Sequence, residues 1–135
     1  MSIELRHVPG TAMAQTVKIR GHELRVDATL DEGGDDSGPN PHDLYDAALG
    51  ACKALTLLWY ARRKDMDVQE VTTLVERDAS AERSGIYRLH TQLQVRGNVT
   101  DEQIAQLEAA THKCPVHKLM TRVSTEISTE VQRMA

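Results

Sequence analysis

The sequence contains no phenylalanine and has only one tryptophan and three tyrosines among its 135 residues. Proteins that bind single-stranded nucleic acid use aromatic side chains on which the bases stack. The net charge of −4 also leaves no excess of basic residues to attract a phosphate backbone or an anionic membrane. The composition therefore argues against nucleic acid and membrane surfaces as partners.

The sequence also lacks a long apolar run. Its most apolar stretch, residues 47–61, is interrupted by Lys53 and falls short of the roughly 20 residues that cross a bilayer. The first ten residues carry Glu4 and Arg6 and have no apolar centre, so they do not resemble a secretion signal. We therefore expect a protein of the cytoplasm.

Cysteine is scarce, since only Cys52 and Cys114 are present. Without a secretion signal, two cysteines are more often free thiols or a redox pair than a structural disulfide. The segment HKCPVH offers His112, Cys114 and His117 as metal ligands, with Cys52 as a fourth, but this spacing matches no common zinc pattern. The sequence has no glycine-rich phosphate loop and no motif of a serine–histidine–aspartate site.

What the sequence does contain is a clear succession of strand and helix patterns. Apolar and polar residues alternate in three early segments, as in half-buried strands: IELRHV, AQTVKIR and HELRVDATL. The acidic, glycine-rich residues 31–40 have no periodicity and predict a mobile loop. Asn40 is a good N-cap and Pro41 suits a first helical position, so a helix is expected from there to about Lys64.

The first two-thirds of this helix are apolar on nearly every side. The residues concerned are Leu44, Ala47, Ala48, Leu49, Ala51, Ala54, Leu55, Leu57 and Leu58. A helix that is hydrophobic most of the way round is buried. We expect it to be the central element of the domain or of a dimer.

Similar patterns fill the rest of the chain. VQEVTTLVERD and GIYRLHTQLQVRG predict strands joined by a turn at ASAERS, and a change of phase between Ile86 and Val95 allows a bulge. Thr100 with Gln103 forms a capping-box pattern that opens a helix, and Cys114 precedes a short helix. The closing alternation VSTEISTEVQ predicts a strand. The order βββ-α-ββ-αα-β, with no repeat or linker, indicates one α+β domain over residues 1–135.

Residue context alone leaves the roles of the two cysteines open. Cys114 stands at a helix start, which lowers a thiol pKa below its free value of about 8.5, or it merely caps the helix. Cys52 is mid-helix among alanine and leucine, where a cysteine is most often a packing residue. His42 on the same helix is about 15 Å away by helical rise. A group that activates Cys52 must therefore come from another element or another subunit.

Together, GPNPHDLYDAALGAC, YARRKDMDV and RGNVTDEQIAQLEAATHKCPVHKLM, followed by a closing strand, resemble the OsmC/Ohr family of organic hydroperoxide reductases. The resemblance covers most of the chain from Gly38 onward. It implies an OsmC-like fold in an intertwined homodimer with the long helices at its centre. It also implies that Cys52 is the peroxidatic thiolate and Cys114 the resolving thiol. No tightly bound cofactor is implied, only an external dithiol of the lipoyl type or a small thiol.

The sequence departs from the family pattern at one important place. In the well-characterised peroxidases a glutamate follows the NP dipeptide and pairs with an arginine of an N-terminal hairpin. Here His42 occupies that position with Asp43 beside it, and the turn HVPGTAM has no arginine. His42 and Asp43 are therefore the candidate supporting residues, and the chain resembles the less characterised OsmC-like branch.

The leading hypothesis is a thiol-dependent peroxidase for organic hydroperoxides, with Cys52 as nucleophile and Cys114 as resolving thiol. The apolar surface around Cys52 favours alkyl or lipid peroxides over hydrogen peroxide. The alternative is a dimer of the same fold that senses redox state or binds a small ligand with little turnover. A third interpretation has both thiols as packing residues.

Overall fold

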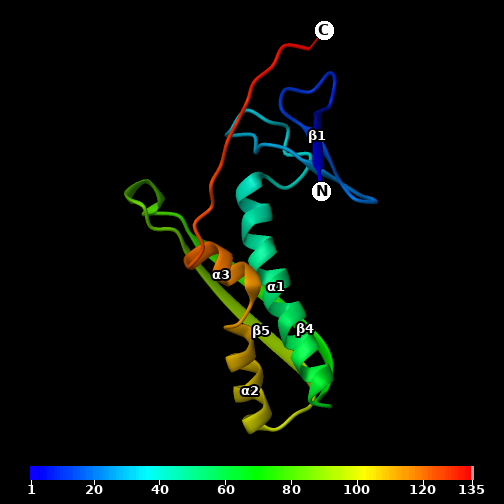
Figure 1. Ribbon diagram of the computed structural model, residues 1–135, viewed down its shortest axis with the longest axis vertical. Coiled ribbons are helices and arrows are strands. Elements are labelled where there is room, and N and C mark those ends of the chain that lie inside the picture. The colour runs from blue at the N-terminus through cyan, green and yellow to red at the C-terminus, as the bar shows by residue number, and fades with distance from the viewer. Residues whose placement is uncertain (135) are drawn as a thin grey trace. The chain divides into compact units, whose positions relative to one another are not determined.

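The structure, a computed structural model, describes residues 1–134 (Figure 1). The chain divides into two compact units. Unit 1 comprises Met1–Ala48 and Val75–His90, and unit 2 comprises Leu49–Leu74 and the residues from Thr91 onward. Each unit thus combines two stretches of sequence. Helix α1 (Pro41–Arg63) and strands β4 (Asp67–Asp78) and β5 (Arg88–Asn98) each contribute residues to both.

Unit 1 begins with the three predicted strands. They are β1 (Ile3–His7), β2 (Gln15–Ile19) and β3 (His22–Val26), which form an antiparallel sheet in the order β1-β2-β3. In this register Val17 lies opposite both Leu5 and Leu24. The alternation of apolar and polar residues therefore predicts these strands correctly.

The segment 31–40 is not the mobile loop that its composition predicts. The carboxylate of Asp27 accepts hydrogen bonds from the hydroxyl of Ser37 at 2.7 Å and from the backbone N–H groups of Ala28, Asp35 and Ser37. The hydrogen bonds from Ser37 come first among the causes that lower the pKa of Asp27 to about 2. A buried carboxylate that lies outside the segment thus fixes its path, which composition alone does not reveal.

Strands β4 and β5 form a second sheet, and the turn between them contains a short 3₁₀ helix, η1 (Glu82–Ser84). Burial alternates from Arg88 to Arg96 of β5, with Leu89, Thr91, Leu93 and Val95 on the more buried side. These four residues therefore share one phase. Ile86 lies before the strand begins, so its different phase has no effect on the pairing.

Unit 2 contains α2 (Asp101–Thr111) and α3 (Pro115–Thr121), as predicted. The capping box is confirmed: the Gln103 N–H donates to the Thr100 hydroxyl at 3.1 Å, and the Thr100 N–H donates to Gln103 Oε1 at 3.0 Å. The core of the unit joins Leu57 and Ala61 of α1 to Leu107 of α2. Partly buried apolar residues of β4 and β5, among them Val71, Leu93 and Val95, pack against it.

The prediction that α1 is buried all round holds for only part of its surface in the single chain. Leu57 and Ala61 are buried, whereas the side chains of Leu55 and Trp59 are 67% and 62% exposed. Within unit 2, α1 therefore presents an apolar face that the chain itself does not cover. Among the described residues, no helix combines the length and apolar character needed to cross a bilayer.

The predicted C-terminal strand is wrong for the single chain. Residues 123–132 have no regular structure, and Figure 1 draws them as an extended trace without an arrow, in orange to red. The side chains of Val123, Ile127 and Val131 are exposed. Alternation supplies the side-chain pattern of a strand, but a strand forms only where its backbone N–H and C=O groups find a partner.

Candidate active site

The two cysteines belong to the same unit and interact. Cys52 lies in the middle of α1, and Cys114 is the N-cap residue of α3. Both are free thiols, and the Cys52 side chain lies close enough to raise the pKa of Cys114. Cys114 is 0% exposed, whereas Cys52 is partly exposed. The fold therefore brings together two thiols that lie far apart in the sequence, and only Cys52 meets solvent in the single chain.

The pKa of Cys114 lies above its ordinary value, contrary to the prediction from its place at a helix start. Burial is the largest cause, and the neighbouring Cys52 side chain raises the pKa further. The backbone N–H groups of His117 and Val116 act in the opposite direction, as expected for a helix N-terminus, but burial outweighs them. Cys114 is thus a protonated thiol at neutral pH.

A buried lysine follows Cys52 directly. Lys53 is 5% exposed, and its Nζ donates to the backbone oxygen of Thr111 at 3.0 Å and lies 3.1 Å from His117 Nδ1. The last turn of α2 has no basic residue of its own. Lys53 therefore provides the positive charge that the negative end of that helix dipole favours.

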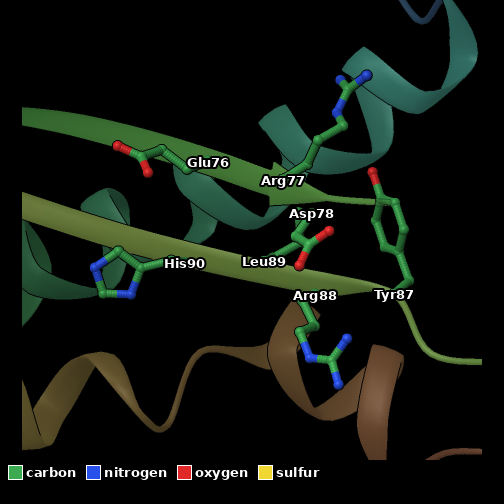
Figure 2. Close-up of a pocket in the computed structure, with 7 residues that line it drawn as sticks. All are labelled: Glu76, Arg77, Asp78, Tyr87, Arg88, Leu89 and His90. Atoms are coloured by element: carbon green, nitrogen blue, oxygen red, sulfur yellow. The ribbon is translucent and has the colours of Figure 1, made fainter. Parts of the chain in front are cut away.

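Unit 1 contains a second polar group of residues, the carboxylate cluster of Asp43, Asp46, Arg77 and Tyr87. Arg77 of β4 donates from Nε to Asp46 and from Nη2 to Asp43, each at 2.5 Å. The Tyr87 hydroxyl donates to the other oxygen of Asp46 at 2.6 Å. Figure 2 shows Arg77 and Tyr87 reaching from the strand ends towards the ribbon of α1. Arg77 and Tyr87 also border a hollow of about 560 Å³ over the strand ends.

The ionisation of this cluster is fixed by its hydrogen bonds. The Asn40 N–H and then Arg77 hold the pKa of Asp43 below its usual value. Burial and the hydrogen bond to Asp46 raise the pKa of Tyr87 to about 12. At neutral pH the cluster therefore consists of a neutral phenol and a guanidinium that binds two side-chain carboxyls.

In the family pattern the residue at the position of His42 pairs with an arginine, but here His42 contacts Glu82 and Tyr87. Its Nε2 lies 3.1 Å from Oε1 of Glu82, and its ring meets Tyr87 edge to face with centroids 5.9 Å apart. With Pro41 and Tyr45 these residues line a cavity of about 390 Å³ within unit 1.

Four residues of these sites were not selected from the sequence as functional. Lys53 stood out only as an interruption of an apolar run, and Asp46 was a similar polar interruption of the helix. An ionisable residue on the buried side of an apolar helix is the signal that could have found both. Arg77 and Tyr87 had no such signal, because only the pairing of distant segments brings them to Asp46.

No group of three or more metal-ligating side chains occurs within residues 1–134. His117, one of the potential ligands in HKCPVH, instead uses Nδ1 to contact Lys53.

Comparison with protein families identifies the chain. Residues 33–130 match the model of a family described as OsmC-like protein. This chain belongs to the OsmC-like family. A search of curated proteins finds no match.

Solved structures of OsmC proteins share the fold. The OsmC-like protein of Mycoplasma pneumoniae superposes with a TM-score of 0.72 at 16% identity, over 90% of this chain and 87% of that one. The organic hydroperoxide resistance protein OsmC of Legionella pneumophila gives 0.64 at 18% identity, over 90% of both chains. OhrB of Bacillus subtilis, an organic hydroperoxide resistance protein, gives 0.58 at 21% identity, also over 90% of both. At these identities the likeness establishes the OsmC fold.

Proposed function

We propose that this OsmC-like chain is a thiol-dependent peroxidase that reduces organic hydroperoxides, with Cys52 as nucleophile and Cys114 as resolving thiol. The observation that carries the proposal is the pair of neighbouring free thiols, of which Cys114 is fully buried. Cys52 is the member of the pair that a peroxide can reach. Names of similar structures, such as the hydroperoxide resistance proteins of Legionella pneumophila and Bacillus subtilis, support the substrate class.

The reaction has two steps within the protein. The Cys52 thiolate attacks the terminal oxygen of the hydroperoxide, so that an S–O bond forms and the O–O bond breaks. The alkoxide leaves, takes a proton and becomes an alcohol, while Cys52 becomes a sulfenic acid. Cys114 then loses its proton and its sulfur attacks the Cys52 sulfur. The S–S bond forms, and hydroxide leaves and takes a proton to become water.

An external dithiol completes the cycle by exchange with the Cys52–Cys114 disulfide, which returns both thiols and oxidises the dithiol. A lipoyl-type dithiol or a small thiol is the reductant that the family resemblance implies. Because both cysteines must be free thiols at the start of each cycle, the reaction suits a reducing compartment such as the cytoplasm.

We further propose that the working form is a homodimer, in which a second copy covers the apolar face of α1 beside Cys52. Leu55 and Trp59 on that face are largely exposed in one chain, and large exposed apolar patches mark interaction surfaces. The unpaired C-terminal residues 123–132 have the alternation of a strand that a second copy can pair. Leu55→Asp should convert a dimer into monomers in sedimentation equilibrium, and a wild-type monomer would contradict the proposal.

His42 and Asp43 remain the predicted supporting residues for the thiolate. The Asp43–Arg77 pair has the chemistry of the acid–arginine pair in the well-characterised peroxidases, although its arginine comes from β4 and not from the N-terminal hairpin. If Asp43 supports the thiolate of the second copy in the proposed dimer, Asp43→Asn should slow alkylation of Cys52 at neutral pH. His42→Ala should do so to a smaller extent, because His42 already binds Glu82.

The decisive experiment is steady-state consumption of cumene hydroperoxide with dihydrolipoamide as reductant. Cys52→Ser should abolish turnover, whereas Cys114→Ser should consume about one equivalent of peroxide and then stop or slow at least tenfold. Turnover that survives in Cys52→Ser would refute the assignment. Reversible oxidation of the wild type without turnover would favour the alternative, a redox sensor or ligand-binding dimer.

A further inference from the structure

Lys53 is a buried cation that the proposed reaction does not use. An ammonium group is seldom buried to 5% exposure, because removal from water is costly unless hydrogen bonds and charges compensate. Among residues 1–134 no carboxylate forms an ion pair with Lys53; its hydrogen-bonding contacts are the Thr111 oxygen and His117 Nδ1. An apolar residue of similar size could not make these two contacts.

The two contacts of Lys53 lie on either side of Cys114 in the chain. Thr111 is the last residue of α2, and His117 lies in the first turn of α3, with Cys114 midway between them. Lys53 itself is the residue after Cys52. One side chain thus connects the turn of α1 that carries one thiol to both ends of the segment that carries the other.

We propose that Lys53 is a positioning residue for disulfide formation: its ammonium holds the Cys114 segment against the turn of α1 that carries Cys52. The three residues Lys53, Thr111 and His117 are called the lysine bridge below. A disulfide forms only when the two Cα atoms lie about 4.4–6.8 Å apart with suitable side-chain directions. The lysine bridge restricts the segment to such positions before the sulfurs react, which raises the effective concentration of one thiol at the other.

The lysine bridge requires a neutral His117. The Lys53 ammonium can only donate, so His117 Nδ1 must accept, which a protonated imidazole cannot do. The groups that face His117 favour this state. Burial lowers its pKa, and so do the positive charges of Lys53, His112 and Arg122 from α1, the turn after α2 and the end of α3.

The inference deepens the proposed function, since the step concerned is the attack of Cys114 on the Cys52 sulfenic acid. Its first test needs no peroxide, however. The equilibrium between the Cys52–Cys114 dithiol and disulfide is measured in glutathione buffers at pH 7. Lys53→Met should lower the equilibrium constant for disulfide formation at least tenfold, about 30 mV for a two-electron couple. Lys53→Arg, which retains the charge and the donors, should stay within about threefold of the wild type.

The second test separates the two chemical steps in a single turnover with cumene hydroperoxide. Sulfenic acid at Cys52 is trapped with dimedone, and disulfide is counted by mass spectrometry after thiol alkylation. In Lys53→Met the sulfenic acid should form within about twofold of the wild-type rate, and the disulfide at least tenfold more slowly. Disulfide formation at the wild-type rate would overturn the proposal, and so would an equal loss in both steps.

His117 provides a matched pair of variants should Lys53→Met fail to fold. His117→Asn keeps an acceptor oxygen near the Nδ1 position, whereas His117→Leu removes it. The proposal requires that the disulfide equilibrium falls in His117→Leu and is largely retained in His117→Asn; equal values would refute it. If the wild type forms no sulfenic acid with peroxide, the proposed function fails. The glutathione equilibrium still decides the role of the lysine bridge.

Discussion

Buried polar atoms have different kinds of partner in the carboxylate cluster of unit 1 and in the cysteine pair of unit 2. In the cluster, Asp46 has a side chain that is 8% exposed, and its oxygens accept from Arg77 and Tyr87. In the cysteine pair, Cys114 is fully buried, and its side-chain partner is the other thiol. A charged guanidinium and a neutral phenol hold the first group, whereas the thiols of the second are only weak hydrogen-bonding groups.

This difference indicates which group contributes to stability and which is free to react. A buried carboxylate that loses a charged donor leaves an uncompensated charge, so the cluster should be costly to disturb. A thiol is a small apolar group with a weak S–H donor, so its loss should affect stability little. Four measurements test the contrast, from the largest expected change in stability to the smallest.

Arg77→Met should lower the free energy of unfolding by about 2–3 kcal/mol, because it removes the positive charge bound to the buried Asp46. Urea denaturation followed by circular dichroism measures the change. Arg96→Met is the control, since Arg96 and Glu70 form an exposed pair with side chains 76% and 58% accessible. Its loss should stay below about 0.5 kcal/mol. Equal losses in the two variants would show that the cluster contributes no more to stability than an exposed ion pair.

Tyr87→Phe should cost about 1.5 kcal/mol, the contribution of a hydrogen bond to a charged acceptor. The substitution should also remove a dependence of stability on pH. The pKa of Tyr87 is raised from 10.0 to about 12, so the neutral phenol is favoured in the folded state. Its stabilisation is complete below pH 10 and is lost as the pH rises towards 12. The wild type should therefore lose more stability than Tyr87→Phe over this range, and parallel curves would contradict the assignment.

In unit 2, stability should depend on pH in the mildly acidic range. The pKa of His117 is lowered from 6.5 in the folded protein, so the unfolded chain binds the proton more readily. Stability from the neutral imidazole is present above about pH 6.5 and is lost as the pH falls below it. The wild type should lose stability between about pH 6.5 and 5, by less than Tyr87→Phe costs. His117→Asn, which does not titrate, should show no loss over that range.

Cys114→Ala should change the free energy of unfolding by less than about 1 kcal/mol, although the residue is fully buried, because it deletes a single weakly bonded atom. Peroxide turnover with a dithiol should nevertheless fall at least tenfold. If Cys114→Ala lowers the free energy of unfolding by more than about 2 kcal/mol while peroxide turnover persists, Cys114 is a structural residue and not a reactive one.

Local patterns predicted most of the fold. The three early strands, α1, the capping box of α2 and the start of α3 follow from alternation, capping residues and proline placement, which act within a few residues. The errors share a cause that is not local. The segment 31–40 is ordered by Asp27 from outside it, and residues 123–132 have a strand pattern without a strand partner in this chain.

The candidate site divides in the same way. The family motifs selected Cys52 and Cys114 as candidates, and in the structure Cys52 acts on the pKa of Cys114. The pKa of Cys114 was predicted in the wrong direction, because burial depends on the packing of α1, α2 and α3 and not on the helix start alone. Arg77 and Tyr87 escaped prediction because they reach Asp46 only when β4 and β5 pair.

The sequence by itself determined most of the elements of this protein, its family and the two candidate thiols, since periodicity, caps and motif spacing depend on neighbouring residues. The tertiary structure decided which thiol is buried, which partners His42 and Asp43 take, and that Lys53 spans the segment around Cys114. Burial and hydrogen bonding between distant segments set these properties, because they exist only once the chain has folded.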